Sequence, residues 1–561
     1  MSADLNIAMI QFNATTGDLN GNAAKIKDAY KQAKNGQGSV LPDVIVSAEQ
    51  SVTGYALDDL VFRKAFLDAT RRTVESLAKI TKDGPPLIVG APWVFEDGTR
   101  QALINAALKL ENGQISDVIS KRALPTYGPF HEQRYYARGN DYAPININGR
   151  KVGIAICRDL WEDECINAFK ANGAEAIISI NASPYEAGKP QDRLGVARRA
   201  AALSGLPVAY VNTLGGQDEL IFDGAGFVMN AAGDVTAAQK QWADDITHAN
   251  MFAPPPAANV LPWREEELAQ TYEAIVLATR DYAHKNGFKS AVIGMSGGID
   301  SALTTAIACD ALGPENVHCL MLAHDDYTSD NSLNFSRESA EMNGCHYSDD
   351  LKIKAPFEAM QAELSKRWDH TKVKETPENI QARLRMLFLF AVSNDEKHLV
   401  LNTSNKSEVA LGHSTFYGDT SGGFAPIKDV WKLQVYELAK WRNNNKCRIG
   451  LGVDGVVVHP EIIAREPTPE LGEDEIDLDL LPPYTVTDPI LKALVEDEAS
   501  VSDIVAMGFE RETVCQLAYH MQKQEFKRAQ TPPGPIVSKR SFAQRERLYP
   551  ITNHYYPRRY E

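Results

Sequence analysis

The residues best placed for chemistry in this 561-residue chain lie in the stretch Ser290–Ser301, SAVIGMSGGIDS. Its apolar run Ala291–Ile293 is typical of a buried strand, and the glycines that follow favour a tight loop. Asp300 and Ser301 then begin an alanine- and leucine-rich helical pattern. A glycine loop at a helix N-terminus directs free backbone N–H groups and the positive end of the helix dipole at one point. The stretch therefore predicts a phosphate-binding site.

The kind of phosphate compound follows from what the loop contains and what it lacks. No lysine follows the glycines, so the GxxxxGK[ST] pattern of P-loop nucleotide-binding proteins is absent. The octet GMSGGIDS resembles the pyrophosphate loop of N-type ATP pyrophosphatases, which cleave ATP between its α- and β-phosphates and leave AMP on the substrate. A plain glycine turn with a helix cap is the alternative. The resemblance implies ATP contacts from Gly294, Met295, Ser296, Gly297, Gly298, Ile299, Asp300 and Ser301.

Three further polar residues stand where apolar runs end in the first half of the chain: Glu49, Lys121 and Cys157. Taken singly, such residues are usually a solvated carboxylate, a solvated ammonium and a small buried thiol. Together they form a chemical set: a thiolate nucleophile, a base that takes its proton, and a cation that stabilises a tetrahedral oxyanion. Such a set hydrolyses an amide through a thioester and releases ammonia.

The contexts of these residues, AEQSVTGYALDDL, KRALPTYGPFHEQRYYARG and GIAICRDLWED, resemble the three catalytic segments of the nitrilase (carbon–nitrogen hydrolase) family. The resemblance covers roughly the first 250 residues, a usual size for one α/β domain. It implies a four-layer α-β-β-α sandwich with Glu49 as base, Lys121 as electrostatic stabiliser and Cys157 as nucleophile. It also implies that Glu132, in the FHE of the second segment, supports these three residues.

The elements that must position the thiol and its neighbours can be expected from the hydrophobic pattern. Strand-like runs alternate with helical stretches, and Asn148-Gly149 is a strong β-hairpin signal. The pattern predicts one helix over 58–82 and strands over 5–13, 44–46, 87–90, 102–110, 115–124, 145–147, 151–156, 176–180 and 208–211. Strands this apolar need helices over their outer faces, so we expect a covered sandwich.

In the second half, strands over 291–294, 317–323, 351–353 and 399–402 alternate with helices, which predicts a doubly wound, Rossmann-like parallel sheet. Ligands of such sheets bind at the carboxyl ends of the strands, where the SGGIDS loop and the segment NTSNKSE both lie. Asp300 and Glu408 carry oxygen ligands suited to Mg²⁺, and a helix cap and a surface carboxylate are the plain alternatives.

The motifs GMSGGIDS, ENIQARLR, LNTSNKSEVALGHSTFYGD, GGFAPIKDV and EFKRAQTPPGPIVSKRSF together resemble the synthetase domain of glutamine-dependent NAD⁺ synthetases. With the nitrilase-like half in front, this resemblance covers essentially the whole chain. It implies that glutamine, ATP and deamido-NAD⁺ are substrates and that Mg²⁺ is the cofactor. The implied contacts are Tyr127, Ser183 and Lys189 for glutamine, Thr403 as a further ATP contact, and Asn379, Glu408 and Lys527 for deamido-NAD⁺.

One segment departs from the family's pattern, because Ala323–Asp326 reads AHDD where a proline and a short polar loop are expected. Nucleotide contacts from this segment are therefore not carried over. Two alternatives stay open. One is another glutamine-dependent ligase with the same ATP loop and a different acceptor carboxylate or carbonyl. The other is a non-catalytic nucleotide-binding protein with an inactive hydrolase half, against which the intact residues at all three hydrolase positions speak.

The triple proline in Met251–Pro262 predicts the domain boundary. We expect a glutaminase domain over 1–252, a proline-rich linker over 253–264 and an ATP-dependent synthetase domain over 265–561. The net charge of −16 argues against nucleic-acid or anionic-membrane partners. Seven cysteines without a CxxC pair, and no apolar run long enough to span a bilayer, are typical of a cytoplasmic protein. We expect a homo-oligomer that acts on small molecules.

Overall fold

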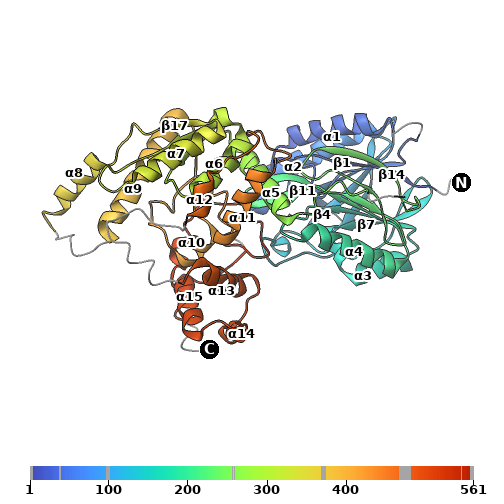
Figure 1. Ribbon diagram of the computed structural model, residues 1–561. Helices are drawn as coiled ribbons and strands as arrows, with labels where there is room; N and C mark the ends of the chain where they lie inside the picture. Colours follow the sequence, from blue (N-terminus) through green and yellow to red (C-terminus); the bar gives the residue numbers. More distant parts are fainter. Residues whose placement is uncertain are drawn as a thin grey trace. The chain divides into compact units, whose positions relative to one another are not determined.

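The computed structural model describes residues 4–36, 40–96, 101–255, 257, 260–367, 375–465, 482–544 and 546–555. The chain forms two compact units, Met1–Glu265 and Glu266–Glu561. Figure 1 labels the helices and strands of each unit. Among the helices in the described ranges, none combines the length and the apolar character that crossing a bilayer requires.

The first unit contains two six-stranded mixed sheets, with the strand orders β14-β1-β2-β3-β4-β5 and β13-β12-β9-β8-β7-β6, and a separate hairpin β10-β11. The strands of the first sheet are β1 (Asn6–Gln11), β2 (Val44–Val46), β3 (Leu87–Glu96), β4 (Gln101–Glu111), β5 (Gln114–Ser120) and β14 (Asp245–Asn250). Those of the second sheet and the hairpin are β6 (Ile145–Ile147), β7 (Arg150–Ile156), β8 (Ala176–Asn181), β9 (Val208–Asn212), β12 (Phe227–Met229), β13 (Val235–Ala238), β10 (Leu214–Gln217) and β11 (Leu220–Asp223).

Helices cover the outer face of each sheet, so the expected four layers are confirmed. Helices α1 (Leu19–Ala33) and α2 (Lys64–Ala78) pack on the first sheet through a shared apolar cluster. Helices α3 (Asp163–Ala171) and α4 (Lys189–Ser204) pack on the second sheet in the same way. Figure 1 shows the strands of this unit between the α1 and α2 layer above and the α3 and α4 layer below.

The period-two pattern of the strands explains this layering. In β1, Ile7 and Met9 enter the core between the two sheets, whereas Ala8 and Ile10 face the helices. Successive side chains of a strand point to opposite faces, so a strand that is apolar at every position is covered on both sides. Central strands such as β2 and β8 are buried along their whole length because each sheet is an inner layer, whereas the edge strands β5 and β14 carry polar, partly exposed residues.

The second unit is built on a parallel sheet with the order β17-β16-β15-β18, which confirms the doubly wound arrangement. On one face, Val292 and Val400 share a core with Leu389 of α9, and on the other, Thr305 of α6 contacts Cys319. The strands are β15 (Ala291–Gly294), β16 (Val317–Leu320), β17 (His346–Ser348) and β18 (Leu399–Leu401).

The remaining helices of the second unit surround this sheet and form a further apolar core near the C-terminus, shared by α10, α13, α14 and α15. Their bounds are α5 (Glu267–Lys285), α6 (Ile299–Leu312), α7 (Asp330–Asn343), α8 (Lys354–Leu364), α9 (Glu375–Glu396), α10 (Lys406–Leu411), α11 (Lys432–Asn444), α12 (Pro460–Ala464), α13 (Tyr484–Glu496), α14 (Val501–Ala506), α15 (Arg511–Lys523) and α16 (Glu525–Arg528).

Two expected elements differ from the structure. The strand expected over 351–353 is wrong, because the polar segment His346–Ser348 pairs with β16 instead. Lys352 makes only an isolated bridge to Ala323, and Ile353 is apolar because it packs beside α9. The single helix expected over 58–82 is interrupted at Arg63, whose backbone is extended (φ −84°, ψ 105°), so a short 3₁₀ turn precedes α2.

Candidate active sites

The first unit brings together four predicted residues, Glu49, Lys121, Glu132 and Cys157, which we call the thiol centre. Glu49 follows β2, Lys121 follows β5, and Cys157 follows β7, so three strand ends of the two sheets supply them. Glu132 begins a short 3₁₀ turn that is sequentially close to Lys121. The two glutamates and the lysine are buried, and the thiol is partly exposed.

A lysine ammonium bridges the two carboxylates of the thiol centre. Lys121 Nζ donates to Glu49 Oε1 at 2.7 Å and to Glu132 Oε1 at 2.8 Å. Glu49 also accepts hydrogen bonds from Asn105 Nδ2 at 2.7 Å and from the backbone N–H of Ala182 at 2.8 Å. Buried charges are tolerated where they are paired and hydrogen-bonded. Lys121 and Glu49 meet both conditions, whereas Glu132 is paired but its Oε2 has no hydrogen-bond partner among the described residues.

The electrostatics of the thiol centre favour a protonated thiol at rest. Burial raises the pKa of the Cys157 thiol, the negative charge of Glu49 raises it further, and Lys121 opposes this rise. Burial also raises the pKa of Glu132 to about 7, against the attraction of Lys121. Burial alone would lower the pKa of Lys121, but the charges of Glu132 and Glu49 outweigh it and raise this pKa well above its usual value. The thiol therefore needs a base, and the lysine stays charged.

The turn that presents the thiol is held by a residue whose role the sequence did not reveal. Cys157 has a positive φ of 48° at the start of a 3₁₀ turn. Asp159, which is buried, accepts the N–H of Ile156 at 3.0 Å and the N–H of Arg122 at 2.9 Å. This carboxylate ties the chain after Lys121 to the turn at Cys157. Asp159 lies within the motif GIAICRDLWED, but the motif does not show its structural role. Only the folded structure shows that it holds the segment after Lys121 to the turn at Cys157.

The three predicted glutamine contacts adjoin the thiol centre. Ser183 follows Ala182, whose N–H binds Glu49, and its hydroxyl accepts from Arg193 Nε at 3.2 Å. Tyr127 is half exposed, and its hydroxyl accepts from Arg158, the residue after Cys157, at 2.9 Å.

The third predicted contact, Lys189, begins α4. Its Nζ lies 5.4 Å from the ring centroid of Trp161, at the end of the Cys157 turn, and 2.8 Å from Glu186. All three side chains thus lie on segments that hold the thiol centre.

In the second unit, the SGGIDS loop joins β15 to α6 as expected. No side chain caps the N-terminus of α6, whose N-cap residue is Gly298. Gly297 has φ +76°, and a Cβ there would lie 2.7 Å from the backbone of Ser332. A residue other than glycine would strain the backbone and collide with α7, so the loop geometry requires this glycine. Uncapped N–H groups at a helix start fit a phosphate.

Beside this loop, the carboxylates Asp300 and Glu408 converge on Lys432, and we call these three residues the acid–lysine cluster. Lys432 Nζ forms a short ion pair with Asp300 Oδ2 and lies 3.7 Å from Glu408 Oε1. Asn405 Nδ2 donates to Asp300 Oδ1 at 3.0 Å. The sequence indicated the two carboxylates, but Lys432 begins a helix 132 positions from Asp300 and was missed.

The charges in the acid–lysine cluster shift its titration strongly. Burial raises the pKa of Glu408 to about 8, the charge of Asp300 contributes to this rise, and Lys432 opposes it. Burial alone would lower the pKa of Lys432, but Asp300 and Glu408 raise it instead. The oxygen atoms of Asp300 and Glu408 lie on either side of Lys432 and are a donor set that fits Mg²⁺, whose positive charge would favour the ionised form of Glu408.

The residues predicted to contact the nucleotides lie on separate segments. Thr403 follows β18, at the same edge of the sheet as the phosphate loop. Asn379 of α9 and Lys527 of α16 both hold the loop after α10. Asn379 Oδ1 accepts from Thr415 Oγ1 at 2.7 Å, and Lys527 Nζ donates to the carbonyl of Ser414 at 2.8 Å. The structure brings Asn379 and Lys527 to one loop.

The atypical segment after β16 is ordered by its own histidine. His324 is buried, and its ring lies 4.4 Å from that of Tyr327 and 5.1 Å from that of Phe357. Its Nδ1 accepts the N–H of Asp326 at 3.3 Å, and Asp326 pairs with Lys354 at 2.8 Å. Aromatic packing and an ion pair fix this turn without the proline that the family's pattern predicts.

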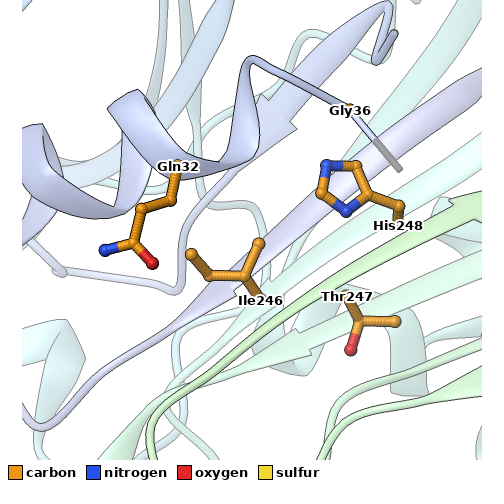
Figure 2. Close-up of a pocket in the computed structure, with 5 residues that line it drawn as sticks. All are labelled: Gln32, Gly36, Ile246, Thr247 and His248. Carbon is orange, nitrogen blue, oxygen red and sulfur yellow. The ribbon is translucent and has the colours of Figure 1, made fainter. Parts of the chain in front are cut away.

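A surface pocket of about 420 Å³ lies elsewhere in the first unit (Figure 2). Figure 2 shows His248, Thr247 and Ile246 on β14 opposite Gln32 of α1, with Gly36 beyond the helix end. His248 Nε2 is 2.8 Å from the carbonyl of Ala33. None of the predicted site residues lines this pocket, and its residues include neither a carboxylate nor a thiol.

Two known protein families match this chain, and each match includes one of the two centres. The family model "Carbon-nitrogen hydrolase" matches residues 6–251, and the family model "NAD synthase" matches residues 271–531. The first match contains the whole thiol centre, and the second contains the phosphate loop and the acid–lysine cluster.

Individual relatives match over nearly the full length. The glutamine-dependent NAD(+) synthetase of Rhodobacter capsulatus is 38% identical, with 99% of both chains covered. That of Aquifex aeolicus is 34% identical, with 98% of this chain and all of the relative covered. The structure of the Acinetobacter baumannii enzyme, solved with ADP, has a TM-score of 0.75 at 34% identity and covers 98% of this chain and 99% of that one. The Cytophaga hutchinsonii enzyme shares the fold, with a TM-score of 0.80 at 19% identity and 98% of both chains covered. The chain therefore belongs to the glutamine-dependent NAD⁺ synthetase family.

Proposed function

We propose that this chain makes NAD⁺ from deamido-NAD⁺, ATP and glutamine, and releases AMP, pyrophosphate and glutamate. One observation carries the proposal: a single chain holds a buried thiol centre in one unit and a phosphate loop with an acid–lysine cluster in the other. The first is built to release ammonia from an amide, and the second to activate a carboxylate with ATP. We assign the glutaminase to 1–252 and the synthetase to 265–561, joined by 253–264.

In the glutaminase half-reaction, Glu49 takes the proton of the Cys157 thiol as the sulfur attacks the amide carbon of glutamine. Lys121 lies beside Glu49 and stabilises the oxyanion of the tetrahedral intermediate. The intermediate collapses to a thioester when Glu49 returns the proton to the leaving nitrogen, which departs as ammonia. Glu49 then activates a water that hydrolyses the thioester to glutamate. Tyr127, Ser183 and Lys189 hold the glutamine.

In the synthetase half-reaction, the nicotinate carboxylate of deamido-NAD⁺ attacks the α-phosphorus of ATP, and pyrophosphate leaves. Backbone N–H groups of the loop Gly294–Ser301, together with Lys432 and Thr403, bind the phosphates. Asp300 and Glu408 would hold Mg²⁺, which supplies positive charge that neutralises the departing pyrophosphate. Ammonia then displaces AMP from the adenylate and forms the amide. Asn379, Glu408 and Lys527 position the dinucleotide.

The replacement Cys157→Ala tests this division of labour. We expect the variant to lose NAD⁺ synthesis with glutamine as nitrogen donor and to retain synthesis with an ammonium salt. Cys165→Ala is the matched control, because Cys165 is a buried thiol of α3 that packs in the core, and it should retain both activities. Loss of ammonium-dependent synthesis in a folded Cys157→Ala protein would contradict two separate centres.

The acceptor is tested by measuring AMP release with different carboxylates. We expect AMP only with deamido-NAD⁺, and AMP formation with another carboxylate instead would favour the related ligase with a different acceptor. All seven cysteines are free, which supports a reducing, cytoplasmic location. The net charge supports small-molecule substrates without nucleic-acid or membrane partners. The homo-oligomer stays a prediction, which light scattering on the purified protein checks.

A further inference from the structure

A group of imidazole and carboxylate side chains lies in the second unit, away from both proposed centres. His318 is the second residue of β16, His398 immediately precedes β18, and Glu396 ends α9. The phosphate loop follows β15 and Thr403 follows β18, so those residues occupy the carboxyl edge of the parallel sheet. The histidines occupy the amino edge of the same sheet. The phosphate loop and Thr403, which we predict to bind ATP, do not lie at this edge.

The register of the sheet explains why these side chains meet. His318 of β16 is level with Val292 of β15, which is level with Val400 of β18. His398 precedes Val400 by two residues, so a continued strand geometry places it on the same face. Helix α9 packs on this face, and its last turn carries Glu396 to His398. Sheet register and helix packing thus direct three separate segments to one place.

The geometry of the three side chains is close to that of a ligand set. One donor atom from each of His318, Glu396 and His398 lies within 4.8 Å of the other two. The two imidazole rings are stacked with their centroids 4.1 Å apart, and His398 Nε2 lies 2.8 Å from Glu396 Oε2. In the described part of the chain, the ring nitrogens of His318 have no hydrogen-bond partner. His318 is therefore ready to accept a ligand from solvent.

His398 has the additional support that metal-binding histidines usually have. Its Nδ1 lies 2.6 Å from Ser290 Oγ, while its Nε2 lies 2.8 Å from Glu396 Oε2. A histidine that binds a metal through one nitrogen commonly donates its other N–H to an oxygen, which fixes the tautomer and the ring. Without a cation, the Glu396 carboxylate accepts the N–H of His398 Nε2, and the Ser290 hydroxyl donates to Nδ1. A cation at Nε2 would favour the other tautomer, in which the proton is on Nδ1 and Ser290 Oγ accepts it.

We propose that His318, Glu396 and His398 bind one divalent cation of the Zn²⁺ class at the amino edge of the sheet. Two imidazole nitrogens and one carboxylate oxygen are a common zinc ligand set, completed by water in tetrahedral geometry. Imidazole ligands disfavour Mg²⁺, which prefers oxygen, so this site differs in chemistry from Asp300 and Glu408. Binding draws the donor atoms to roughly 3.3 Å from one another. The His318 ring is stacked between His346 and His398, so binding also requires this partly exposed ring to tilt out of the stack until its lone pair points at the cation.

The expected consequence of binding concerns stability. The cation would join β16, the start of β18 and the end of α9, with β15 held between the two strands. A ligand that binds only the folded state raises the unfolding temperature, and the stabilisation grows with the logarithm of its concentration relative to Kd. Because the site lies at the opposite edge from the phosphate loop, catalysis does not require the cation.

The test uses the full-length protein, freed of metal with a chelator and titrated with Co²⁺ as the spectroscopic probe and then with Zn²⁺. His318→Gln is the main variant, because this side chain makes no hydrogen bond within the described residues and its loss should leave the fold intact. We expect wild type to bind one more equivalent of Co²⁺ than this variant and to show a visible absorption band that the variant lacks. We expect its affinity at this site to fall more than about 100-fold.

Two further variants keep the outcome unambiguous. Glu396→Gln should weaken binding by about 10-fold or more. His346→Gln is the matched control, since His346 stacks on His318 at 4.6 Å yet lies outside the ligand group, and it should bind like wild type. Zn²⁺ should raise the unfolding temperature of wild type and of His346→Gln, but not of His318→Gln. Equal stoichiometry in wild type and His318→Gln, or an equal loss in His346→Gln, would overturn the proposal.

Discussion

Both proposed centres place a lysine between two carboxylates, but they differ in how tightly the lysine is paired and in how far the carboxylates are exposed to solvent. Lys121 lies 2.7 and 2.8 Å from Glu49 and Glu132, and all three side chains are at most 4% exposed. Lys432 lies close to Asp300 but 3.7 Å from Glu408, and these carboxylates are 18% and 24% exposed. The thiol centre is complete before substrate arrives. In the acid–lysine cluster the carboxylates remain partly exposed, so a charged substrate and its cation can still bind to them.

This difference reflects the two substrates. Glutamine brings no net charge to the scissile amide, so the protein itself must supply every charge that stabilises the transition state. ATP brings several negative charges and a cation with it, so the synthetase centre needs carboxylates that can exchange partners. In the first unit, the lysine thus provides a fixed positive charge for the transition state. In the second unit, the lysine is a counter-ion whose carboxylate partners change when substrate binds.

The largest effect is expected from Lys121→Met. Removing the ammonium leaves Glu49 and Glu132 buried without a counter-charge, which costs about 3–5 kcal/mol in the free energy of unfolding. We expect glutamine hydrolysis to fall by more than about 10³-fold. Denaturant unfolding and a glutaminase assay measure the two effects. Lys64→Met, at an exposed lysine of α2, should change neither, and near wild-type stability of Lys121→Met would show that the closed network matters little.

Lys432→Met should have the opposite selectivity. We expect ammonium-dependent NAD⁺ synthesis to fall by about 10²- to 10³-fold, because the carboxylates repel each other and the phosphates lose a cation. Glutamine hydrolysis by the same variant, measured without ATP, should stay close to wild type. The loss of stability should be smaller than for Lys121→Met, since Asp300 and Glu408 are partly solvated. Equal destabilisation by the two replacements would contradict the contrast between a closed and an open centre.

Asp159→Asn probes how the thiol centre is positioned. The amide keeps the shape of the side chain but replaces an acceptor oxygen with a donor, so the groups bound to that oxygen lose their partner. The buried Arg122 guanidinium also loses its counter-charge. We expect kcat for glutamine hydrolysis to fall by about 10- to 100-fold while KM changes little, because the turn at Cys157 is displaced. Steady-state kinetics separate the two constants. A change in KM alone would show that Asp159 serves binding and not the position of the thiol.

The smallest expected effect is a pH dependence confined to the thiol centre. The pKa of Glu132 is raised to about 7, so this carboxylate gains a proton as the pH falls through that value and then holds Lys121 less firmly. Glutamine hydrolysis should therefore decline below about pH 7. Glu132→Gln should be about 10-fold slower at higher pH and should lose this dependence.

Tyr55→Phe sharpens the same measurement. The Tyr55 hydroxyl donates to Glu132 at 3.0 Å and lowers the pKa of that carboxyl. Its removal should move the acid limb of the profile to higher pH. A shift toward lower pH, or an unchanged limb in Glu132→Gln, would assign the pH dependence to another group.

Much of each centre could be predicted because the residues stand in short sequence motifs at the ends of apolar strands. Cys157 stands directly after an apolar strand, and Gly297 occupies a position where a side chain would collide with the next helix. Such residues are visible in a short window of sequence, and their motifs resemble known families. The sheets could be predicted for the same reason, since strands buried on both faces are apolar at every position.

The parts that could not be predicted depend on distance in the chain. Lys432 is 132 positions from Asp300, and Asn105 is 56 positions from Glu49, so only the folded sheet brings each pair together. The edge strand His346–Ser348 is polar because one side of it lacks a neighbouring strand. Ile353, which we expected in a strand over 351–353, is apolar because it packs beside a helix. Burial against a distant partner has no local signature.

The shared acceptor Asp159 also couples two catalytic segments of the first unit to each other. Its carboxylate binds backbone groups on both sides of the first unit's centre, at Arg122 and at Ile156. The strand end with Lys121 and the turn with Cys157 therefore become ordered together. A change that frees one of these two segments therefore also displaces the other, so the amidase is lost as a unit and not one residue at a time.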